Sequence, residues 1–274
     1  MQYVAVGGGR IPALGFGSYG MSTEEMLRMI PHALRAGFRH VDTAQVYGNE
    51  EGVGAGIEAS GVPRSEVFIT TKVWVANYAK SRFAASVDES LRKLRTDYID
   101  LLLLHWPFDG VPLAEQIGTL NELVDVGKVR QIGVSNFNLA LMRQSVNLTR
   151  HPLVTNQVEY HPYLNQSTLI AGAREAGMTV TAYCAMAVGR VFAEPLLQEI
   201  ARRHQKSVSQ VVLRWLIQQD GVIALSRTVQ ESRVAQNVEI FNFELTNEEM
   251  AAVHSLAAPR SRIVSPPGLA PAWD

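Results

Sequence analysis

The sequence predicts an α/β fold, a (β/α)8 TIM barrel in which eight parallel strands alternate with helices. Three observations support this prediction. The chain has 274 residues, of which 47% are hydrophobic, and this is sufficient for one barrel of ordinary size. Segments of strand and helix character alternate along the chain without a linker or a break in composition. The strand candidate at 99–104 holds an unbroken run of leucines, which is typical of a parallel strand buried on both faces. We therefore expect one domain over residues 1–274.

The elements follow one another in a regular order. The segment that ends at Pro12 is predicted to form a β-hairpin around a glycine turn, because no helix start follows it. A helix is predicted from Thr23 to Gly37, because Ser22 and Glu25 have the spacing of a capping box. The eight barrel strands are expected at residues 13–16, 39–42, 67–73, 99–104, 131–134, 154–158, 179–183 and 222–225.

The glycines after the hairpin allow a different interpretation. Gly15, Gly17 and Gly20 match the G-x-G-x-x-G pattern of a dinucleotide-binding βαβ unit. Asp42, at the end of the next strand, would then bind a ribose. However, that pattern needs its glycines in the first turn of the helix, whereas the capping box starts the helix at Ser22, after the last glycine. The barrel is therefore the preferred prediction.

Composition and charge exclude several classes of protein. The formal net charge is -1 and the pI is about 6.7, so neither a nucleic acid nor a membrane surface is expected as a partner. The single cysteine, Cys184, cannot form an intrachain disulfide, which indicates a reducing compartment. The N-terminal segment lacks the pattern of a signal peptide, and the longest apolar run is too short to span a bilayer. The sequence thus predicts a cytoplasmic protein.

Chemically active side chains follow three consecutive predicted strands. Asp42 and Tyr47 follow the second strand, Lys72 lies near the end of the third, and His105 follows the fourth. Singly, each has an ordinary explanation, since a strand-end aspartate often caps a turn and a strand-end lysine is often solvated. In a barrel, the carboxyl ends of the strands form one rim that carries the active site. We therefore expect these four side chains to converge there.

The four side chains suit a reduction. A free phenol, with a pKa of about 10, is a poor proton donor at neutral pH. A lysine cation beside Tyr47 would stabilise the phenolate, and Asp42 would hold Lys72 charged and in place. His105 would orient a carbonyl oxygen. This chemistry protonates an oxygen while a hydride reaches carbon, so it requires a hydride carrier. No metal site is predicted.

The second half of the chain offers a site for that carrier. Ser135, Asn136 and Gln157 follow or end strands five and six, where hydroxyl and amide groups suit a carboxamide. Tyr183, at the end of strand seven, offers a flat face for a planar ring. An alternative role for Asn136 is to cap the next helix.

These residues lie in motifs that resemble the aldo-keto reductase family from end to end. Within the family the chain is most similar to the prokaryotic 2,5-diketo-D-gluconic acid reductases, particularly the B type, whose ending resembles residues 262–274. The motifs are Asp42-Thr43-Ala44 with Tyr47-Gly48-Asn49-Glu50, Thr71-Lys72-Val73-Trp74, Leu104-His105-Trp106-Pro107, Gly133-Val134-Ser135-Asn136-Phe137, Asn156-Gln157-Val158-Glu159 and Ile240-Phe241-Asn242-Phe243-Glu244-Leu245.

The resemblance implies roles for these residues. Tyr47 would be the proton donor, tuned by Asp42 and Lys72, and His105 would orient the substrate. NADPH would be the cofactor. Its nicotinamide amide would be bound by Ser135, Asn136 and Gln157, its ring would stack on Tyr183, and its 2'-phosphate end would be bound by Arg227, Thr228, Arg233, Gln236 and Asn237.

Departures from the family pattern concern the pyrophosphate loop and the pocket. The family's Ser-Pro-Leu-Gly after the stacking tyrosine is replaced by 184–189, so the pyrophosphate contacts around 185–190 cannot be assigned. Tyr19 replaces a common tryptophan. The expected substrate pocket comprises Tyr19, Trp74, His105 and Trp106, with a C-terminal tail that includes Trp273 folded over the barrel mouth.

The sequence therefore predicts a monomeric, NADPH-dependent reductase of aldehydes or ketones. Three substrate classes stay open: keto-sugar acids such as 2,5-diketo-D-gluconate, methylglyoxal-like 2-oxoaldehydes, and a broad range of aldehydes. The alternative is a cofactor-sensing, non-catalytic barrel subunit of a larger assembly, which the complete set of four active-site residues disfavours.

Overall fold

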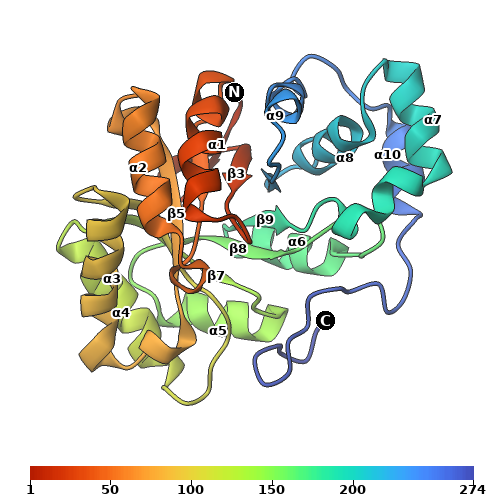
Figure 1. Cartoon of the computed structure of the whole chain (residues 1–274). Helices are drawn as coiled ribbons and strands as arrows, with labels where there is room; N and C mark the ends of the chain where they lie inside the picture. The colour runs from red at the N-terminus through yellow and green to blue at the C-terminus, as the bar shows by residue number, and fades with distance from the viewer.

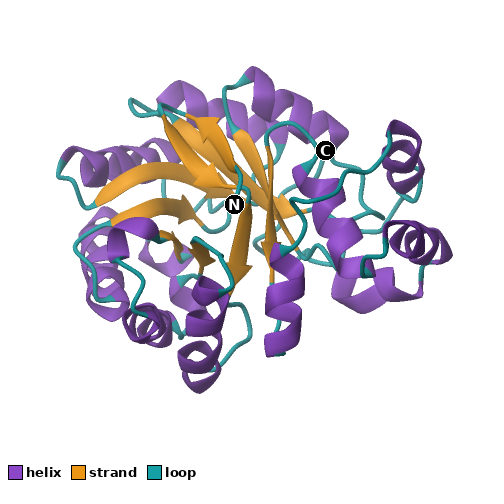
Figure 2. Ribbon diagram, turned by 90° about the horizontal axis from the view of Figure 1, so that it is seen from above, coloured by secondary structure: helices purple, strands orange, loops and turns teal.

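The computed structural model describes all 274 residues and contains a closed barrel of eight parallel strands. In Figure 2 the strands occupy the middle of the molecule and the helices surround them. All eight predicted strands are present, with bounds within two residues of those expected, so the predicted barrel is confirmed. The strands are β3 (Leu14–Gly17), β4 (His40–Asp42), β5 (Phe68–Val73), β6 (Ile99–Leu104), β7 (Val129–Ser135), β8 (Leu153–Glu159), β9 (Thr179–Tyr183) and β10 (Val222–Ser226), and β10 pairs with both β3 and β9 to close the barrel.

Helices follow most strands and cover the outside of the barrel (Figure 1). The first helix begins at the predicted capping box, in which Ser22 and Glu25 exchange hydrogen bonds with each other's backbone. The α-helices are α1 (Thr23–Arg35), α2 (Glu50–Ser60), α3 (Lys80–Leu94), α4 (Leu113–Asp125), α5 (Leu139–Leu148), α6 (Ser167–Glu175), α7 (Pro195–His204), α8 (Val208–Ile217), α9 (Glu231–Val238) and α10 (Asn247–His254). Short 3-10 turns lie at η1 (Gln45–Tyr47), η2 (Arg64–Glu66), η3 (Val75–Asn77) and η4 (Ala187–Ala193). No helix combines the length and the apolar character that crossing a membrane would require.

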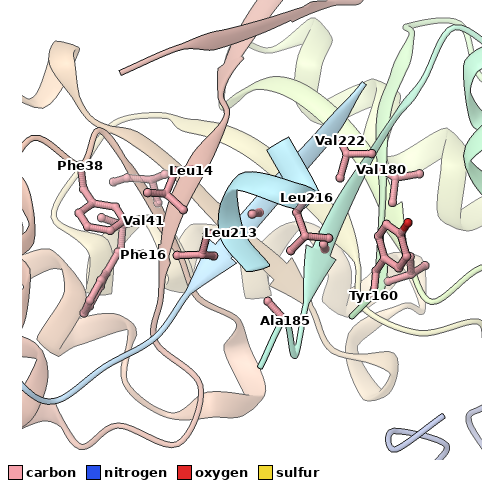
Figure 3. Packing of buried hydrophobic residues seen from close by; sticks show 14 of the residues in the cluster. Leu14, Phe16, Phe38, Val41, Tyr160, Val180, Ala185, Leu213, Leu216 and Val222 are labelled. Atoms are coloured by element: carbon pink, nitrogen blue, oxygen red, sulfur yellow. The ribbon is translucent and has the colours of Figure 1, made fainter. Parts of the chain in front are cut away.

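The main core lies between the strands and the helices. In Figure 3, Leu213 and Leu216 of α8 lie among buried side chains of the strands, including Leu14, Phe16 and Val222. Burying a large aliphatic side chain stabilises the fold by about 1.5 to 3 kcal/mol. The packing of the helices therefore fixes the positions of the strand ends.

The predicted hairpin is confirmed, and it closes the N-terminal end of the barrel. β1 (Tyr3–Val6) pairs antiparallel with β2 (Gly9–Pro12). Ile11 of β2 is fully buried in a second, smaller cluster. This cluster fills the barrel toward the end where the strands begin. The opposite end, where the strands finish, is therefore open for a functional site. The other members of the cluster are Leu101, Leu103, Val154 and Ile223.

The barrel also explains the glycines that resemble a dinucleotide-binding loop. A Cβ on Gly15 would lie 2.7 Å from Nδ1 of His40 and 2.6 Å from a methyl carbon of Leu225. Gly15 is therefore required by packing inside the barrel. Gly20 has a φ of 67°, a left-handed turn conformation that glycine adopts without strain. Neither glycine lies within the helix, which begins at Thr23, and the Rossmann alternative is excluded by the closed sheet.

The C-terminal tail, residues 255–274, contains no helix or strand and runs from α10 along the lower right of Figure 1 toward α5. On the way, the backbone N–H groups of Ile263 and Val264 donate to Glu159, the last residue of β8. The tail ends near α5, where Nδ2 of Asn138 donates a hydrogen bond to the carbonyl oxygen of Ala272. The Trp273 ring lies 6.4 Å from the Trp106 ring, centroid to centroid. The tail thus covers part of the barrel mouth, as expected.

Candidate active site

The structure brings Asp42, Tyr47, Lys72 and His105 together at the carboxyl rim of the barrel. Lys72 Nζ lies 2.6 Å from Asp42 Oδ1 and 5.2 Å from the centroid of the Tyr47 ring. The rings of Tyr47 and His105 are 5.6 Å apart, edge to face. The convergence predicted from the strand ends is therefore found.

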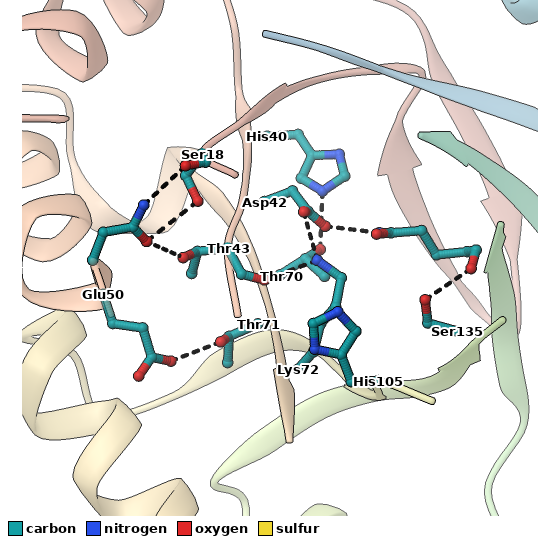
Figure 4. A network of polar contacts seen from close by, with 12 residues as sticks. Ser18, His40, Asp42, Thr43, Glu50, Thr70, Thr71, Lys72, His105 and Ser135 are labelled. Carbon is teal, nitrogen blue, oxygen red and sulfur yellow. Dashed lines mark hydrogen bonds and ion pairs between the residues drawn. The ribbon is translucent and has the colours of Figure 1, made fainter. Parts of the chain in front are cut away.

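The ion pair of Lys72 and Asp42 is buried and satisfied (Figure 4). Lys72 Nζ also donates to the carbonyl oxygen of Thr43 at 2.9 Å, and Nε2 of Gln157 donates to Asp42 Oδ2 at 2.7 Å. Burial lowers the pKa of Lys72, and Asp42 opposes that shift. Removing one partner of a buried pair commonly costs about 3 to 5 kcal/mol, because the other charge is left uncompensated. The pair is thus fixed in position.

His105 presents a neutral imidazole to the rim. Burial, followed by the nearby Lys72 charge, lowers the pKa of His105 to about 2, so the ring stays uncharged at any working pH. Its Nδ1 is buried without a partner. The ring of Trp74 lies 5.4 Å from the His105 ring and, together with Tyr47, restricts its orientation. A neutral ring held in this way can form a hydrogen bond with a substrate oxygen.

Tyr47 differs from expectation in its acidity. Loss of solvation, followed by the Asp42 charge, raises the pKa of Tyr47 well above its ordinary value. The sequence predicts the opposite effect, because a lysine cation beside a phenol favours the phenolate. The structure shows why this effect does not prevail: Asp42, 2.6 Å from Lys72 Nζ, offsets part of the lysine charge, so Lys72 does not outweigh the loss of solvation at the phenol. The Tyr47 hydroxyl is therefore protonated at neutral pH, and it has no hydrogen-bond partner within the protein.

Asn49 is a structural member of the site that sequence reasoning did not single out. Its Nδ2 donates to the carbonyl oxygens of Ser18 and Met21, both at 2.9 Å, and its Oδ1 accepts from Thr43 Oγ1. Asn49 thus ties the loop that carries Tyr19 to the loop that carries the proton-donor candidate. Asn49 belongs to the same sequence motif as Asp42 and Tyr47, and this was the signal that could have identified it as part of the site.

The nicotinamide-site candidates form one hydrogen-bonded network. Tyr183 OH donates to Asn136 Oδ1 at 2.6 Å, and Asn136 Nδ2 donates to Ser135 Oγ and to the carbonyl oxygen of His105. Ser135 Oγ donates to the backbone oxygen of Gln157. The structure therefore brings all four candidates together and connects them to the rim residues.

The helix-capping alternative for Asn136 is wrong. Asn138, two residues later, is the N-cap of α5, and its side chain accepts a hydrogen bond from the backbone N–H of Leu141. Asn136 instead has a φ of 63°, a left-handed conformation that asparagine tolerates better than most residues. This conformation directs the chain from β7 into the loop.

The phosphate-end candidates lie after β10 and on α9, and they are more exposed. Arg227 and Arg233 are both exposed, and neither forms an ion pair with a carboxylate. Arg227 makes one hydrogen bond, to the carbonyl oxygen of Gly20 at 3.1 Å. Thr228 is buried and Gln236 is exposed.

Asn237, the last of these candidates, is buried and only half satisfied. Its Nδ2 donates to Ser226 Oγ at 2.8 Å, whereas its Oδ1 is buried without a partner. A buried carbonyl oxygen of this kind is costly unless a donor reaches it. The group is therefore suited to accept a hydrogen bond from a ligand.

The pocket candidates surround the catalytic side chains on two sides. Tyr19 is 69% exposed, and its ring lies 5.1 Å from the Tyr47 ring. Trp74 packs against His105. Trp106 is only 6% exposed, and the Trp273 ring of the tail packs against it. Within the unassigned loop at 185–190, residues 187–190 belong to η4, and the backbone at 187–189 is left-handed.

Comparison with known proteins identifies the class of this chain. Residues 12–258 match the model of the aldo/keto reductase family, so the protein belongs to this family and is an oxidoreductase. Among curated relatives, methylglyoxal reductase DkgB of Escherichia coli O157:H7 is 38% identical over 267 residues, which is 96% of this chain and 99% of the relative.

Solved structures agree with this assignment. The crystal structure of a "putative 2,5-diketo-D-gluconic acid reductase B" is 59% identical with a TM-score of 0.99, and the match covers 100% of this chain and 98% of that one. The aldo-keto reductase of Bombyx mori in complex with NADP is 34% identical with a TM-score of 0.88, over 93% and 92% of the two chains.

Proposed function

We propose that this protein reduces an aldehyde or ketone to an alcohol, with NADPH as the hydride donor and Tyr47 as the proton donor. The observation that carries the proposal is the Tyr47 hydroxyl. It is protonated, has no partner in the protein, and lies between a neutral His105 and the buried pair of Lys72 and Asp42. This arrangement suits protonation of a carbonyl oxygen.

The residues divide the work as follows. His105 holds the carbonyl oxygen beside the Tyr47 hydroxyl. NADPH, when bound, would supply the hydride that the carbonyl carbon accepts. Tyr47 gives its proton to the developing alkoxide. Lys72 then stabilises the phenolate that remains, and Asp42 keeps the lysine charged and in place. Because the surrounding groups are fixed before the reaction, little reorganisation is needed.

The side chains fit a nicotinamide nucleotide. Gln157 uses its Nε2 to hold Asp42, which leaves its Oε1 to accept a hydrogen bond from a carboxamide N–H. Tyr183 is half-buried with its hydroxyl fixed, so its ring can support a planar ring. At the other end, Arg227 and Arg233 have no carboxylate partner and suit a 2'-phosphate.

The remaining phosphate-end residues complete this proposed assignment. The free Oδ1 of Asn237 would accept a hydrogen bond, which suits an amino group rather than a phosphate oxygen. Thr228 and Gln236 lie on the same segment. The Bombyx mori relative, whose structure is a complex with NADP, supports the same cofactor here.

The relatives' names support two substrate classes, 2-oxoaldehydes such as methylglyoxal and keto-sugar acids such as 2,5-diketo-D-gluconate. The aromatic side chains of Tyr19 and Trp74 beside the catalytic residues would form the pocket wall. We propose that 2-oxoaldehydes and related small carbonyl compounds are the preferred class.

A panel of carbonyl compounds ranked by kcat/KM with NADPH tests the proposal. The panel should contain methylglyoxal, 2,5-diketo-D-gluconate and simple aldehydes. We expect turnover with at least one 2-oxoaldehyde. Tight NADPH binding without turnover of any compound would instead favour a cofactor-sensing subunit. Analytical ultracentrifugation should show the proposed monomer of 30.2 kDa.

A further inference from the structure

Glu159 is a buried carboxylate at the carboxyl end of β8 that takes no part in the proposed proton transfer. Its side chain is fully buried, and its position is the last residue of the strand, on the same rim as the catalytic residues. Building on the proposed carbonyl reduction, we infer that Glu159 is the positioning residue that docks the C-terminal tail over the barrel mouth and thereby sets substrate preference.

The contacts of Glu159 are directed at the tail. The backbone N–H groups of Ile263 and Val264 donate to its two carboxylate oxygens at 2.7 and 2.8 Å. Arg262 Nη1 lies 4.0 Å from Oε2. On the barrel side, Nε2 of the buried His161 lies 2.9 Å from Oε1. One carboxylate therefore joins three consecutive tail residues to the end of a barrel strand.

These contacts are stronger than the other attachments of the tail. Hydrogen bonds to an ionised oxygen are about twice as strong as neutral ones, and burial protects them from water. By contrast, the hydrogen bond from Asn138 to the tail and the one from the Leu139 N–H to Asp274 are exposed. Because residues 255–274 form no helix or strand, the N–H groups at 263 and 264 have no other partner. A backbone hydrogen bond from the Ala258 N–H to the carbonyl oxygen of Tyr163, at 3.1 Å, holds only the start of the tail. Glu159 is therefore the principal side-chain anchor of the tail.

The anchored segment leads directly to the pocket. The Arg262 guanidinium lies 3.7 Å from the centroid of the Trp273 ring, which in turn packs against Trp106, the neighbour of His105. Tail residues 268–271 also line a neighbouring pocket of about 460 Å³, together with residues at 107–113 and at 137–144. A shift of the tail would therefore change the shape of the mouth beside the substrate-orienting histidine.

Hydrogen exchange measured by NMR gives the direct test, and it does not depend on activity. The N–H groups of Ile263 and Val264 should be protected in the wild-type protein, and Glu159→Gln should reduce their protection by at least about tenfold. A glutamine fills the same space but lacks the charge and one of the two acceptors. If these N–H groups exchange freely in the wild-type protein, Glu159 does not dock the tail and the proposal is overturned.

Glu249→Gln is the matched control. Glu249 is also a buried carboxylate that accepts from a histidine, His204, and from a backbone N–H, that of Thr246. It lies on α10, away from the mouth. This variant should leave the exchange of the N–H groups at 263 and 264 unchanged. A similar loss of protection in both variants would mean that general destabilisation explains the effect.

A double-mutant cycle tests the second part of the proposal, that docking of the tail sets substrate preference. Glu159→Gln should change the ratio of kcat/KM for 2,5-diketo-D-gluconate to that for methylglyoxal by about tenfold in the full chain. In a chain that lacks residues 262–274, the same substitution should change this ratio by less than about twofold, because the tail is already absent. An equal change in both backgrounds would show that Glu159 acts without the tail.

Two further measurements distinguish a failure of tail docking from a loss of cofactor binding and from a variant that does not fold. The Kd of NADPH should change by less than about twofold in Glu159→Gln, because the Tyr183 hydroxyl is held by Asn136 and not by the Glu159 carboxylate. If Glu159→Gln does not fold, Ile263→Pro removes one donor and leaves the carboxylate intact, and it should shift the substrate ratio in the same direction. If the N–H groups at 263 and 264 are protected from exchange but the protein reduces no carbonyl compound, the tail-docking proposal stands and the proposed function is refuted.

Discussion

The two sides of the barrel rim are built on opposite principles. On the side of β4 and β5, Asp42 and Lys72 are buried and every polar atom of the pair has a partner. On the side of β10 and α9, Arg227 and Arg233 are exposed. The Arg227 side chain makes one hydrogen bond, to Gly20, and the Arg233 side chain makes none. The first side is fixed before any ligand arrives, and the second has charges that are free to meet one.

This difference follows from the two tasks proposed for the rim. Proton transfer depends on distances that must be correct in the transition state, so the groups are best held by a rigid surrounding. Capture of a phosphate depends on charge, and exposed arginines provide it at little cost in burial. Substitutions on the two sides should therefore affect different kinetic constants.

The largest effect is expected on the buried side, from Tyr47→Phe. Loss of the proton donor should lower kcat by about 10²- to 10⁴-fold and leave the NADPH affinity nearly unchanged. Steady-state kinetics and a fluorescence titration with NADPH measure the two quantities. Tyr98→Phe is a suitable control, because Tyr98 packs between Arg64 and Arg130 outside the proposed site. Turnover close to wild type in Tyr47→Phe would remove Tyr47 from its role.

The exposed side should control the choice of cofactor. We expect the wild-type protein to prefer NADPH over NADH by roughly 30- to 1000-fold in kcat/KM. The double variant Arg227→Ala, Arg233→Ala should lose most of this preference by weakening NADPH alone. Arg174→Ala, which removes an exposed arginine paired with Asp220, should keep it. Equal use of NADH and NADPH by the wild-type protein would contradict the phosphate-site assignment.

The buried side should also make stability depend on pH. Burial lowers the pKa of His40 to about 4 and that of His105 to about 2, below the ordinary value of 6.5. The unfolded chain therefore binds more protons, and stability falls as the pH drops below 6.5. Each histidine contributes about 1.4 kcal/mol per pH unit, down to its own folded pKa. Urea unfolding at pH 7, 6 and 5 measures this slope, and His40→Asn should reduce it. An unchanged slope in that variant would show that His40 is not responsible.

The smallest effect should come from salt. Raising the ionic strength from about 0.01 to 0.15 M shortens the Debye length from about 30 to 8 Å, which screens exposed charges far more than buried ones. The KM for NADPH should therefore rise severalfold while kcat stays constant. The KM for NADH, which lacks the 2'-phosphate, should change less. An equal rise for both cofactors would indicate that the exposed arginines do not discriminate between them.

The sequence alone determined the fold and the placement of the catalytic candidates. Strand periodicity and the capping box at Ser22 and Glu25 are local signals, and they located the elements within two residues. Because parallel strands in a barrel end on one rim, the order of Asp42, Lys72 and His105 along the chain was sufficient to predict that they meet.

Only the tertiary structure decided how these groups are held. The bond from Gln157 to Asp42 joins residues 115 positions apart, and the bond from Ile263 to Glu159 spans 104. The hydrophobic periodicity of the sequence does not predict such pairs, because they depend on which loops meet above the rim. The protonation of Tyr47 and His105 was also beyond the sequence, since the pKa of each depends on how completely the folded chain removes water from the ring and on which charges remain beside it.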